Sequence, residues 1–189
     1  MQTSTDFTNL FNQRFAQNFL PVPATSPLYP GRVAPDFALR NVQTGQQVKL
    51  SDYTGNNPET IGWNRPTVLI FTRIFTERHY CPLCYPHIKA MNESYEQFVH
   101  QGAEVLMITS TDERQSQIVA QDLGLKMPLL SNSSCTAFRK YQVGQALGAP
   151  LPAQFIVDRT GKIQFRHLFS FLEPNASVDR LLAILDTIS

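Results

Sequence analysis

Two cysteines three positions apart, Cys81 and Cys84, carry the clearest chemical signal in this chain of 189 residues. They follow an apolar segment, residues 67–71, whose β-branched and aromatic side chains predict a buried strand. Apolar residues at helical spacing begin at Ile88, so we expect both thiols at the start of a helix. The partial positive charge there favours a thiolate and lowers a cysteine pKa from about 8.5 towards neutrality. The pattern indicates redox chemistry.

A metal site is the main alternative for this cysteine pair. Structural zinc takes four ligands, usually from two such pairs, and the chain offers only Cys135 and four histidines besides. His87 extends the run, but steps of three along one helix spread ligands over its surface. Attachment of a c-type haem requires histidine directly after the second cysteine, where Tyr85 stands. We therefore favour redox chemistry, expect no metal and no cofactor, and keep two inert buried cysteines as an alternative. Cys135 itself is expected to be a small, half-buried residue.

Length and composition predict one α/β domain with an extension. The chain is 42% hydrophobic and 16% charged, which suffices for one good core. A formal net charge of +1, with no local cluster of lysine and arginine, disfavours nucleic acid as a partner. The amino terminus lacks the pattern of a secretory signal and no segment is long enough to span a membrane, so we expect a cytoplasmic protein without membrane contact. Three cysteines are too few for a disulfide framework and fit a reducing compartment.

The first 31 residues differ from the rest. Apolar residues at helical spacing predict a short amphipathic helix that Asp6 could cap; they are Phe7, Leu10, Phe11, Phe15 and Phe19. We favour packing of its apolar face against the same chain over a contact in a homodimer or on a membrane surface. A stiff, extended linker is predicted by the prolines that follow, which are Pro21, Pro23, Pro27 and Pro30. The chain then divides into an extension, residues 1–31, and a domain, residues 32–189.

Strand and helix patterns alternate through that domain. Strands are expected at residues 35–39, 47–50, 67–71, 104–108, 154–158 and 162–165. Helices are expected after the cysteine pair, from Asp112, through Phe138 and Tyr141, and from Ser177. The first and last strand pairs read as hairpins, and the centre reads as a βαβ unit. The prediction is a central mixed sheet with flanking helices and an amino-terminal hairpin.

Three segments carry a resemblance to a known family. They are Ala34-Pro35-Asp36-Phe37, the strand leading into Cys81-Pro82-Leu83-Cys84, and the run LPAQFIVDRTG at residues 151–161. From about Arg32 to the carboxyl end the chain resembles the peroxiredoxin-like branch of the alkyl hydroperoxide reductase and thiol-specific antioxidant (AhpC/TSA) family. The resemblance implies a thioredoxin-like fold.

It also implies a thiol peroxidase acting on hydrogen peroxide or organic hydroperoxides. Cys81 matches the peroxidatic cysteine, which attacks the O–O bond and becomes a sulfenic acid. Cys84 would be the resolving cysteine, which condenses with Cys81 into a disulfide. Thioredoxin or a similar dithiol protein would reduce that disulfide.

Two features depart from the family pattern. Peroxiredoxins usually carry proline seven residues before the peroxidatic cysteine and threonine or serine three before it, where this chain has Ile74 and Arg78. The usual arginine three residues before the aromatic of the later strand is replaced by Pro152, which matches the cis-proline with which thioredoxins bind an extended partner chain. A thioredoxin-like oxidoreductase acting on protein disulfides therefore stays open as a second function, with a non-catalytic thiol sensor behind it.

Side chains just before Cys81 are further candidates. Arg78 is expected to stabilise the thiolate and the developing charge on the peroxide, with Arg73 a less favoured choice. His79 is expected to be merely exposed rather than a proton donor. Tyr80 stands where thioredoxins carry tryptophan and is expected to pack over the thiols on the side that binds a partner.

Overall fold

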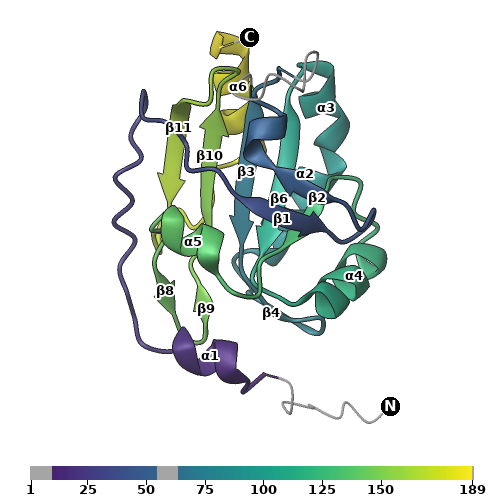
Figure 1. Ribbon diagram of the computed structural model, residues 1–189, viewed down its shortest axis with the longest axis vertical. Helices are drawn as coiled ribbons and strands as arrows, with labels where there is room; N and C mark the ends of the chain where they lie inside the picture. Colours follow the sequence, from purple (N-terminus) through teal and green to yellow (C-terminus); the bar gives the residue numbers. More distant parts are fainter. Residues whose placement is uncertain (1–9, 55–63, 189) are drawn as a thin grey trace.

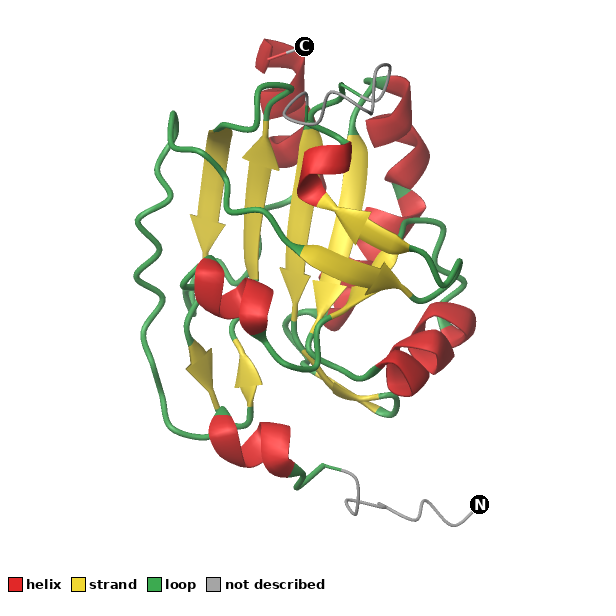
Figure 2. Ribbon diagram, in the orientation of Figure 1, coloured by secondary structure: helices red, strands yellow, loops and turns green. Residues whose placement is uncertain are grey.

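The computed structural model describes residues 10–54 and 64–188 of the chain. Within them, one seven-stranded sheet lies between helices on its two faces (Figure 1; Figure 2). The strands across the sheet are β11 (Ile163–Leu168), β10 (Ala153–Val157), β3 (Thr67–Thr72), β6 (Glu104–Thr109), β7 (Leu129–Ser131), β1 (Ala38–Asn41) and β2 (Gln47–Lys49). Strands β3, β6 and β7 are parallel, and the other neighbouring pairs are antiparallel. The predicted mixed α/β sheet is confirmed.

Helices cover both faces of this sheet. The helical elements are α1 (Gln13–Gln17), a 3-10 turn η1 (Leu50–Asp52), α2 (Tyr85–Glu93), α3 (Tyr95–His100), α4 (Glu113–Asp122), α5 (Thr136–Lys140) and α6 (Val178–Ile188). Residues of α2, α3, α4 and α6 share one hydrophobic cluster, and residues of α5 and η1 belong to the other. Asp112 caps α4 as expected, because its side chain accepts a hydrogen bond from the Gln115 N–H at 2.8 Å.

The central strand β3 is buried on both sides, which explains its continuous apolar run. Val68 and Ile70 contribute to the cluster beneath α2 and α6. Leu69 and Phe71 point to the opposite face, where the Phe71 ring lies 5.1 Å from that of Phe138 in α5. The strand that leads to the cysteine pair is therefore held from both sides of the sheet.

Two small hairpins were not predicted from the sequence. Strands β4 (Ile74–Thr76) and β5 (His79–Tyr80) form the first, between the end of β3 and Cys81. Strands β8 (Gln145–Ala146) and β9 (Ala149–Pro150) form the second, where the sequence pattern indicated only a break. Both hairpins lie below the main sheet in the view of Figure 1. The first hairpin leads directly into Cys81.

The amino-terminal extension packs on the same chain, but mainly through Arg14 and not through the apolar face that we expected to be buried, since Phe11 and Phe19 are exposed. Helix α1 is shorter than expected and is capped by Asn12, whose Oδ1 accepts from the Phe15 N–H at 2.9 Å; Asp6 and Phe7 lie outside the described residues. The extended segment that follows runs beside β8 and β11 (Figure 1). It forms bridges from Val22 to Gln145 and from Val33 to Lys162.

Two glycines of the second hairpin allow this close approach. A Cβ atom at Gly148 would lie 2.0 Å from the ring of Phe15, and one at Gly144 would lie 2.6 Å from the carbonyl oxygen of Val22. Both glycines also have positive φ, a conformation that residues with a side chain rarely adopt. The segment that breaks the sequence pattern is thus the surface on which the extension lies.

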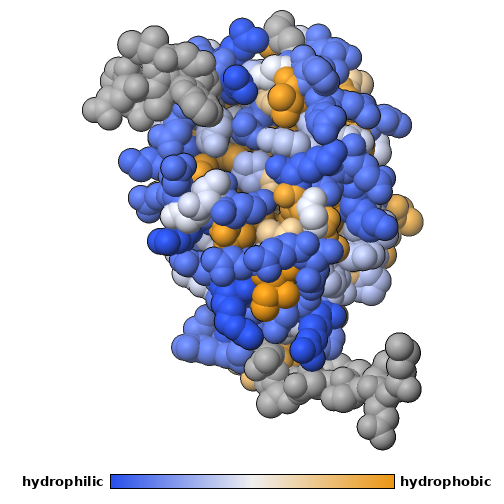
Figure 3. All heavy atoms as spheres, turned by 90° about the vertical axis from the view of Figure 1, so that its right-hand side faces the viewer, coloured by the Kyte–Doolittle hydropathy of each residue, from blue (hydrophilic) through white to orange (hydrophobic). Residues whose placement is uncertain are grey.

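The side of the molecule with α3 and α4 is mostly hydrophilic, and its apolar residues form small separate groups (Figure 3). None of the helices in the described parts of the chain has the length and apolar character to cross a bilayer.

Replacing Gly148 by alanine should loosen the extension. We expect the free energy of unfolding to fall by about 2 to 4 kcal/mol, because the new methyl group meets the Phe15 ring in addition to the strain of a positive φ. The matched control is Gly124→Ala, which has a positive φ but no atom within 4 Å of the added Cβ; it should cost about 1 kcal/mol. Urea denaturation of both variants measures the difference. Equal losses of unfolding free energy in Gly148→Ala and Gly124→Ala would contradict the contact. So would a loss from Gly148→Ala that stays the same when Phe15 is also replaced by alanine.

Candidate active site

The cysteine pair lies in the turn between the first small hairpin and α2. Cys84 is the N-cap of α2, and Cys81 precedes it by one turn. The Cys81 carbonyl oxygen accepts hydrogen bonds from the N–H groups of Cys84 and Tyr85 at 2.9 and 3.0 Å. Pro86 stands at the second helical position, where the absent N–H has no intrahelical partner to lose. Both thiols are therefore at the start of the helix, with Cys81 just outside it.

The Cys81 thiol is set up as the thiolate of the pair. A hydrogen bond from the Cys84 thiol, the largest cause, lowers the pKa of Cys81 to about 6, although burial acts in the opposite direction. The backbone N–H groups of Leu83 and Cys84 and the charge of Arg73 lower it further. Cys81 is only 5% exposed, so these donors act in surroundings with little water. A large part of Cys81 is thus ionised at neutral pH.

The Cys84 thiol stays protonated. Donation of its hydrogen bond to Cys81, together with its burial, raises the pKa of Cys84 well above the ordinary range. Both cysteines are free thiols in the structure. One turn of chain therefore holds a buried thiolate and, within hydrogen-bond reach, the thiol that stabilises it.

Arg73 supplies the positive charge. It follows β3 directly and is 8% exposed, and burial lowers its own pKa while the Cys81 thiol acts to raise it. Its Nη2 donates to the carbonyl oxygen of Ala146 and, at 3.4 Å, to that of Leu147. Its guanidinium carbon lies 4.8 Å from the centre of the Phe75 ring. In the described residues Arg73 has no carboxylate partner, so Cys81 is the anion that compensates its charge.

Arg78 does not occupy the place that its spacing from Cys81 suggested. It lies exposed in the turn of the β4–β5 hairpin, where its N–H donates to Thr76 Oγ1 at 3.2 Å. The hairpin carries residue 78 to its tip and pairs residue 74 with residue 80, which returns the chain to Arg73. The expectation is corrected accordingly, and Arg73 is the arginine beside the thiols. His79 is partly buried and hydrogen-bonds Thr76 Oγ1 through Nδ1 at 2.8 Å.

Tyr80 is the last residue of β5 and lies beside the start of α2. Its ring packs edge-on against that of Tyr85, with 5.2 Å between the ring centres, and against the core. Burial raises the pKa of Tyr80 to about 12, so its hydroxyl stays protonated. Pro82 and Leu83 are exposed beside it. This turn is the part of the cysteine motif that another molecule can reach.

Pro152 differs from the thioredoxin proline that it resembles in sequence. The peptide bond before it is trans, since the described residues contain no cis bond. The side chain is also buried at the start of β10 and presents no face to a partner. The expectation that Pro152 forms part of a partner-binding surface is not supported by this position.

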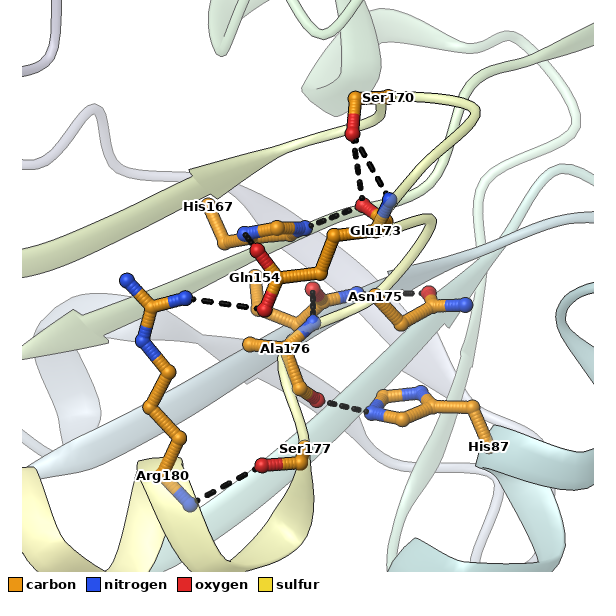
Figure 4. A network of polar contacts seen from close by, with 9 residues as sticks. All are labelled: His87, Gln154, His167, Ser170, Glu173, Asn175, Ala176, Ser177 and Arg180. Atoms are coloured by element: carbon orange, nitrogen blue, oxygen red, sulfur yellow. Dashed lines mark hydrogen bonds and ion pairs between the residues drawn. The ribbon is translucent and has the colours of Figure 1, made fainter.

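A polar network that sequence reasoning missed joins Gln154, Asn175, Ala176 and His87 (Figure 4). Asn175 donates to the Leu83 carbonyl oxygen at 3.0 Å and accepts from Gln154 of β10 at 2.9 Å. Gln154 also accepts from the Ala176 N–H at 2.8 Å, and His87 of α2 donates to the Ala176 carbonyl oxygen at 2.9 Å. The loop before α6 therefore fixes both the turn and the helix. Residues from three separate segments meet here, and no local pattern indicates that.

Cys135 is buried rather than half-buried. It is 2% exposed, and burial raises the pKa of its thiol although Arg14 and Asn18 act against this. It precedes α5 with φ 55°, a positive value unusual for a residue with a side chain. A pocket of about 180 Å³, lined partly by Asn18, lies beside it. The described residues hold no group of three or more metal-binding side chains.

Known proteins resemble this chain in sequence and in fold. A model of the AhpC/TSA family matches residues 30–166. The chain belongs to the AhpC/TSA family. Among curated AhpC/TSA-like relatives, thiol-disulfide oxidoreductase ResA of Geobacillus kaustophilus is 26% identical over 85% of this chain and 75% of its own length. Chloroplastic peroxiredoxin Q of Gentiana triflora is 28% identical over 83% of this chain and 66% of its own length.

Solved structures show the same fold. Peroxidoxin BcpB from Mycobacterium tuberculosis superposes with a TM-score of 0.70 and 22% identity, covering 86% of this chain and 99% of that chain. Reduced 2-Cys peroxiredoxin of Plasmodium vivax gives a TM-score of 0.70 and 21% identity, covering 86% and 82%. The chain is thus a thiol-dependent oxidoreductase of the AhpC/TSA family, whose relatives include both peroxiredoxins and disulfide oxidoreductases.

Substitutions should raise the pKa of Cys81 in a defined order. Cys84→Ala removes the largest stabilising contact and should have the greatest effect, and Arg73→Gln should raise the pKa by about 1 unit. Arg78→Gln changes an exposed arginine and is the comparison; it should leave the pKa of Cys81 unchanged. The pH dependence of iodoacetamide alkylation, followed on the Cys81 peptide by mass spectrometry, reports each value. A shift in Arg78→Gln as large as that in Arg73→Gln would refute the assignment.

Burial of His87 should make stability depend on pH. Burial, the largest cause, lowers the pKa of His87 to about 4, whereas the unfolded chain has the ordinary value of about 6.5. The unfolded state then binds more protons between these values, so the free energy of unfolding falls as pH drops through this range, by about 1 to 3 kcal/mol. His87→Gln keeps a donor but does not titrate, and its denaturation curves should show a smaller loss from pH 6.5 to 4. An unchanged slope would rule out the His87 contribution.

Proposed function

We propose that the protein is a thiol-dependent peroxidase that reduces hydrogen peroxide or organic hydroperoxides through Cys81. The observation that carries this proposal is the pairing of a stabilised Cys81 thiolate with a protonated Cys84 beside a buried arginine. A peroxide reductant needs a reactive thiolate, charge stabilisation for the transition state and a second thiol that removes the sulfenic acid. The site contains all three.

The first step oxidises Cys81. The thiolate sulfur attacks one peroxide oxygen, the O–O bond breaks, and the leaving oxygen takes up a proton from solvent to give water or an alcohol. Cys81 keeps the other oxygen and a proton as a sulfenic acid. Arg73 faces the charge that moves from sulfur to the leaving oxygen, and the N–H groups of Leu83 and Cys84 lie on the sulfur side.

The second step uses Cys84. Its sulfur attacks the Cys81 sulfenic acid, an S–S bond forms, and hydroxide leaves with the thiol proton as water. Two electrons from a dithiol protein of the thioredoxin kind would then reduce the disulfide. That partner would approach over Pro82 and Leu83, which are exposed next to the buried sulfurs. A reducing compartment such as the cytoplasm fits this cycle.

A disulfide oxidoreductase is the second candidate function. The low pKa of Cys81 in a Cys-x-x-Cys turn would equally serve attack on a protein disulfide, and one relative is a thiol-disulfide oxidoreductase. Against it stands Pro152, which is buried and follows a trans bond. The peroxidase therefore remains our first choice.

Stopped-flow oxidation by hydrogen peroxide tests the proposal. The reduced wild type should form the Cys81–Cys84 disulfide rapidly, and Cys81→Ser should abolish this reaction. Cys84→Ser should stop at a sulfenic acid on Cys81, which a dimedone adduct detects by mass. Cys135→Ser is the matched control for loss of a buried cysteine and should react as the wild type does. Oxidation no faster than that of a free thiol would refute the peroxidase, and rapid reduction of insulin disulfides would then support the second candidate.

A further inference from the structure

We propose that the amino-terminal extension, residues 12–22, is a positioning element that holds the Arg73 guanidinium against the cysteine pair. The inference rests on the proposed role of Arg73 towards Cys81, but not on which oxidant the thiolate attacks. According to this inference, the extension contributes to the function of the site by positioning one of its side chains.

Two peptide groups in the turn of the β8–β9 hairpin connect the extension to Arg73. Their carbonyl oxygens, on Ala146 and Leu147, accept hydrogen bonds from Arg73. Their N–H groups, on Leu147 and Gly148, donate to the carbonyl oxygens of Phe19 and Asn18, both at 3.0 Å. A peptide group is planar and trans, so a bond that fixes its N–H also fixes the direction of its C=O. The extension thereby aims both acceptors at the guanidinium.

The backbone conformation of the β8–β9 turn is one that hydrogen bonds from the extension would stabilise. Leu147 has φ 51° and Gly148 has φ 85°, both positive as in a type I′ hairpin turn. The left-handed region is unfavourable for leucine by about 1 kcal/mol. Leu147 is also 61% exposed, so its side chain contributes little burial. The hydrogen bonds to Asn18 and Phe19 are therefore an important restraint on the turn.

Arg14 of α1 hydrogen-bonds the chain next to Arg73. Its Nη2 donates to the carbonyl oxygen of Phe75, whose ring lies against the Arg73 guanidinium. Its Nη1 donates to the Ser110 carbonyl oxygen and, at 3.2 Å, to the Ser110 hydroxyl. Arg14 is 9% exposed, so these charge-assisted bonds are shielded from water. The α1 region thus holds both the backbone at Phe75, whose ring contacts Arg73, and the β8–β9 turn, whose carbonyl oxygens accept from Arg73.

Apart from its hydrogen bond with the Cys81 thiol, Arg73 has few contacts besides these, so it depends on them. Its Nε is buried without a hydrogen-bond partner among the described residues, and no carboxylate there pairs with it. Carbonyl oxygens and an aromatic face hold the guanidinium without neutralising it. Release of the extension would let the turn rotate and the guanidinium move towards water, which would weaken its effect on Cys81.

Two variants of the full chain test this inference through the Cys81 thiol. Arg14→Gln removes the contact with Phe75, and Phe15→Ala removes the ring that packs on Gly148; neither residue touches Cys81. Both should move the pH profile of Cys81 alkylation upwards by about 0.5 to 1 pH unit, a two- to fivefold lower rate at pH 6. Arg159→Gln, which removes an exposed arginine far along the chain, is the control and should keep the wild-type profile.

A double variant shows whether the effect passes through Arg73. In an Arg73→Gln background, adding Arg14→Gln should produce no further shift, since the group being positioned is gone. A further shift of the same size would show that Arg14 acts by its own charge and would overturn the inference, as would wild-type profiles in Arg14→Gln and Phe15→Ala. Circular dichroism identifies any variant that fails to fold, and the other single variant then decides. The alkylation contains no peroxide, so its outcome is separate from that of the peroxidase test.

Discussion

A buried arginine with no carboxylate partner among the described residues is the constraint on which the rest of the site depends. Moving a guanidinium out of water is costly unless an anion or aligned dipoles replace the solvent. Around Arg73 the chain provides peptide carbonyls, one aromatic face and a thiol that can ionise. A carboxylate would be ionised at neutral pH and would neutralise the guanidinium. A thiol can be neutral or ionised, so the positive charge of Arg73 remains available to stabilise the thiolate. The site therefore favours ionised Cys81 for the same reason that it tolerates buried Arg73.

Most of the scaffold follows from local sequence patterns. The apolar run before the cysteines, the βαβ order and the terminal helix are recognisable because strand and helix periodicity are properties of short segments. The start of α2 was also predictable, because apolar residues at helical spacing begin at Ile88, one turn after the cysteine pair. The central strand is held in place because its apolar side chains enter the core on both faces of the sheet. These side chains are recognisable in the sequence of the strand itself.

The errors concern residues whose place depends on pairing between segments. Arg78 is closer to Cys81 in sequence than Arg73 is, but the β4–β5 hairpin reverses the chain and brings the more distant residue to the thiol. Its turn, at Glu77 and Arg78, contains neither glycine nor asparagine, so the usual hairpin signal is missing. Pro152 and the Asn175 network likewise depend on how strands and loops meet, which spacing along one segment does not describe.

The contact between Phe15 and Gly148 also limits how the sequence can change over time. A larger residue at position 148 is excluded while the aromatic ring is present, and loss of the ring first leaves the turn without its cover. The two positions lie 133 residues apart, yet neither can drift freely while the other is fixed. Among descendants of this chain, the extension and the second hairpin should therefore be inherited or lost as one unit.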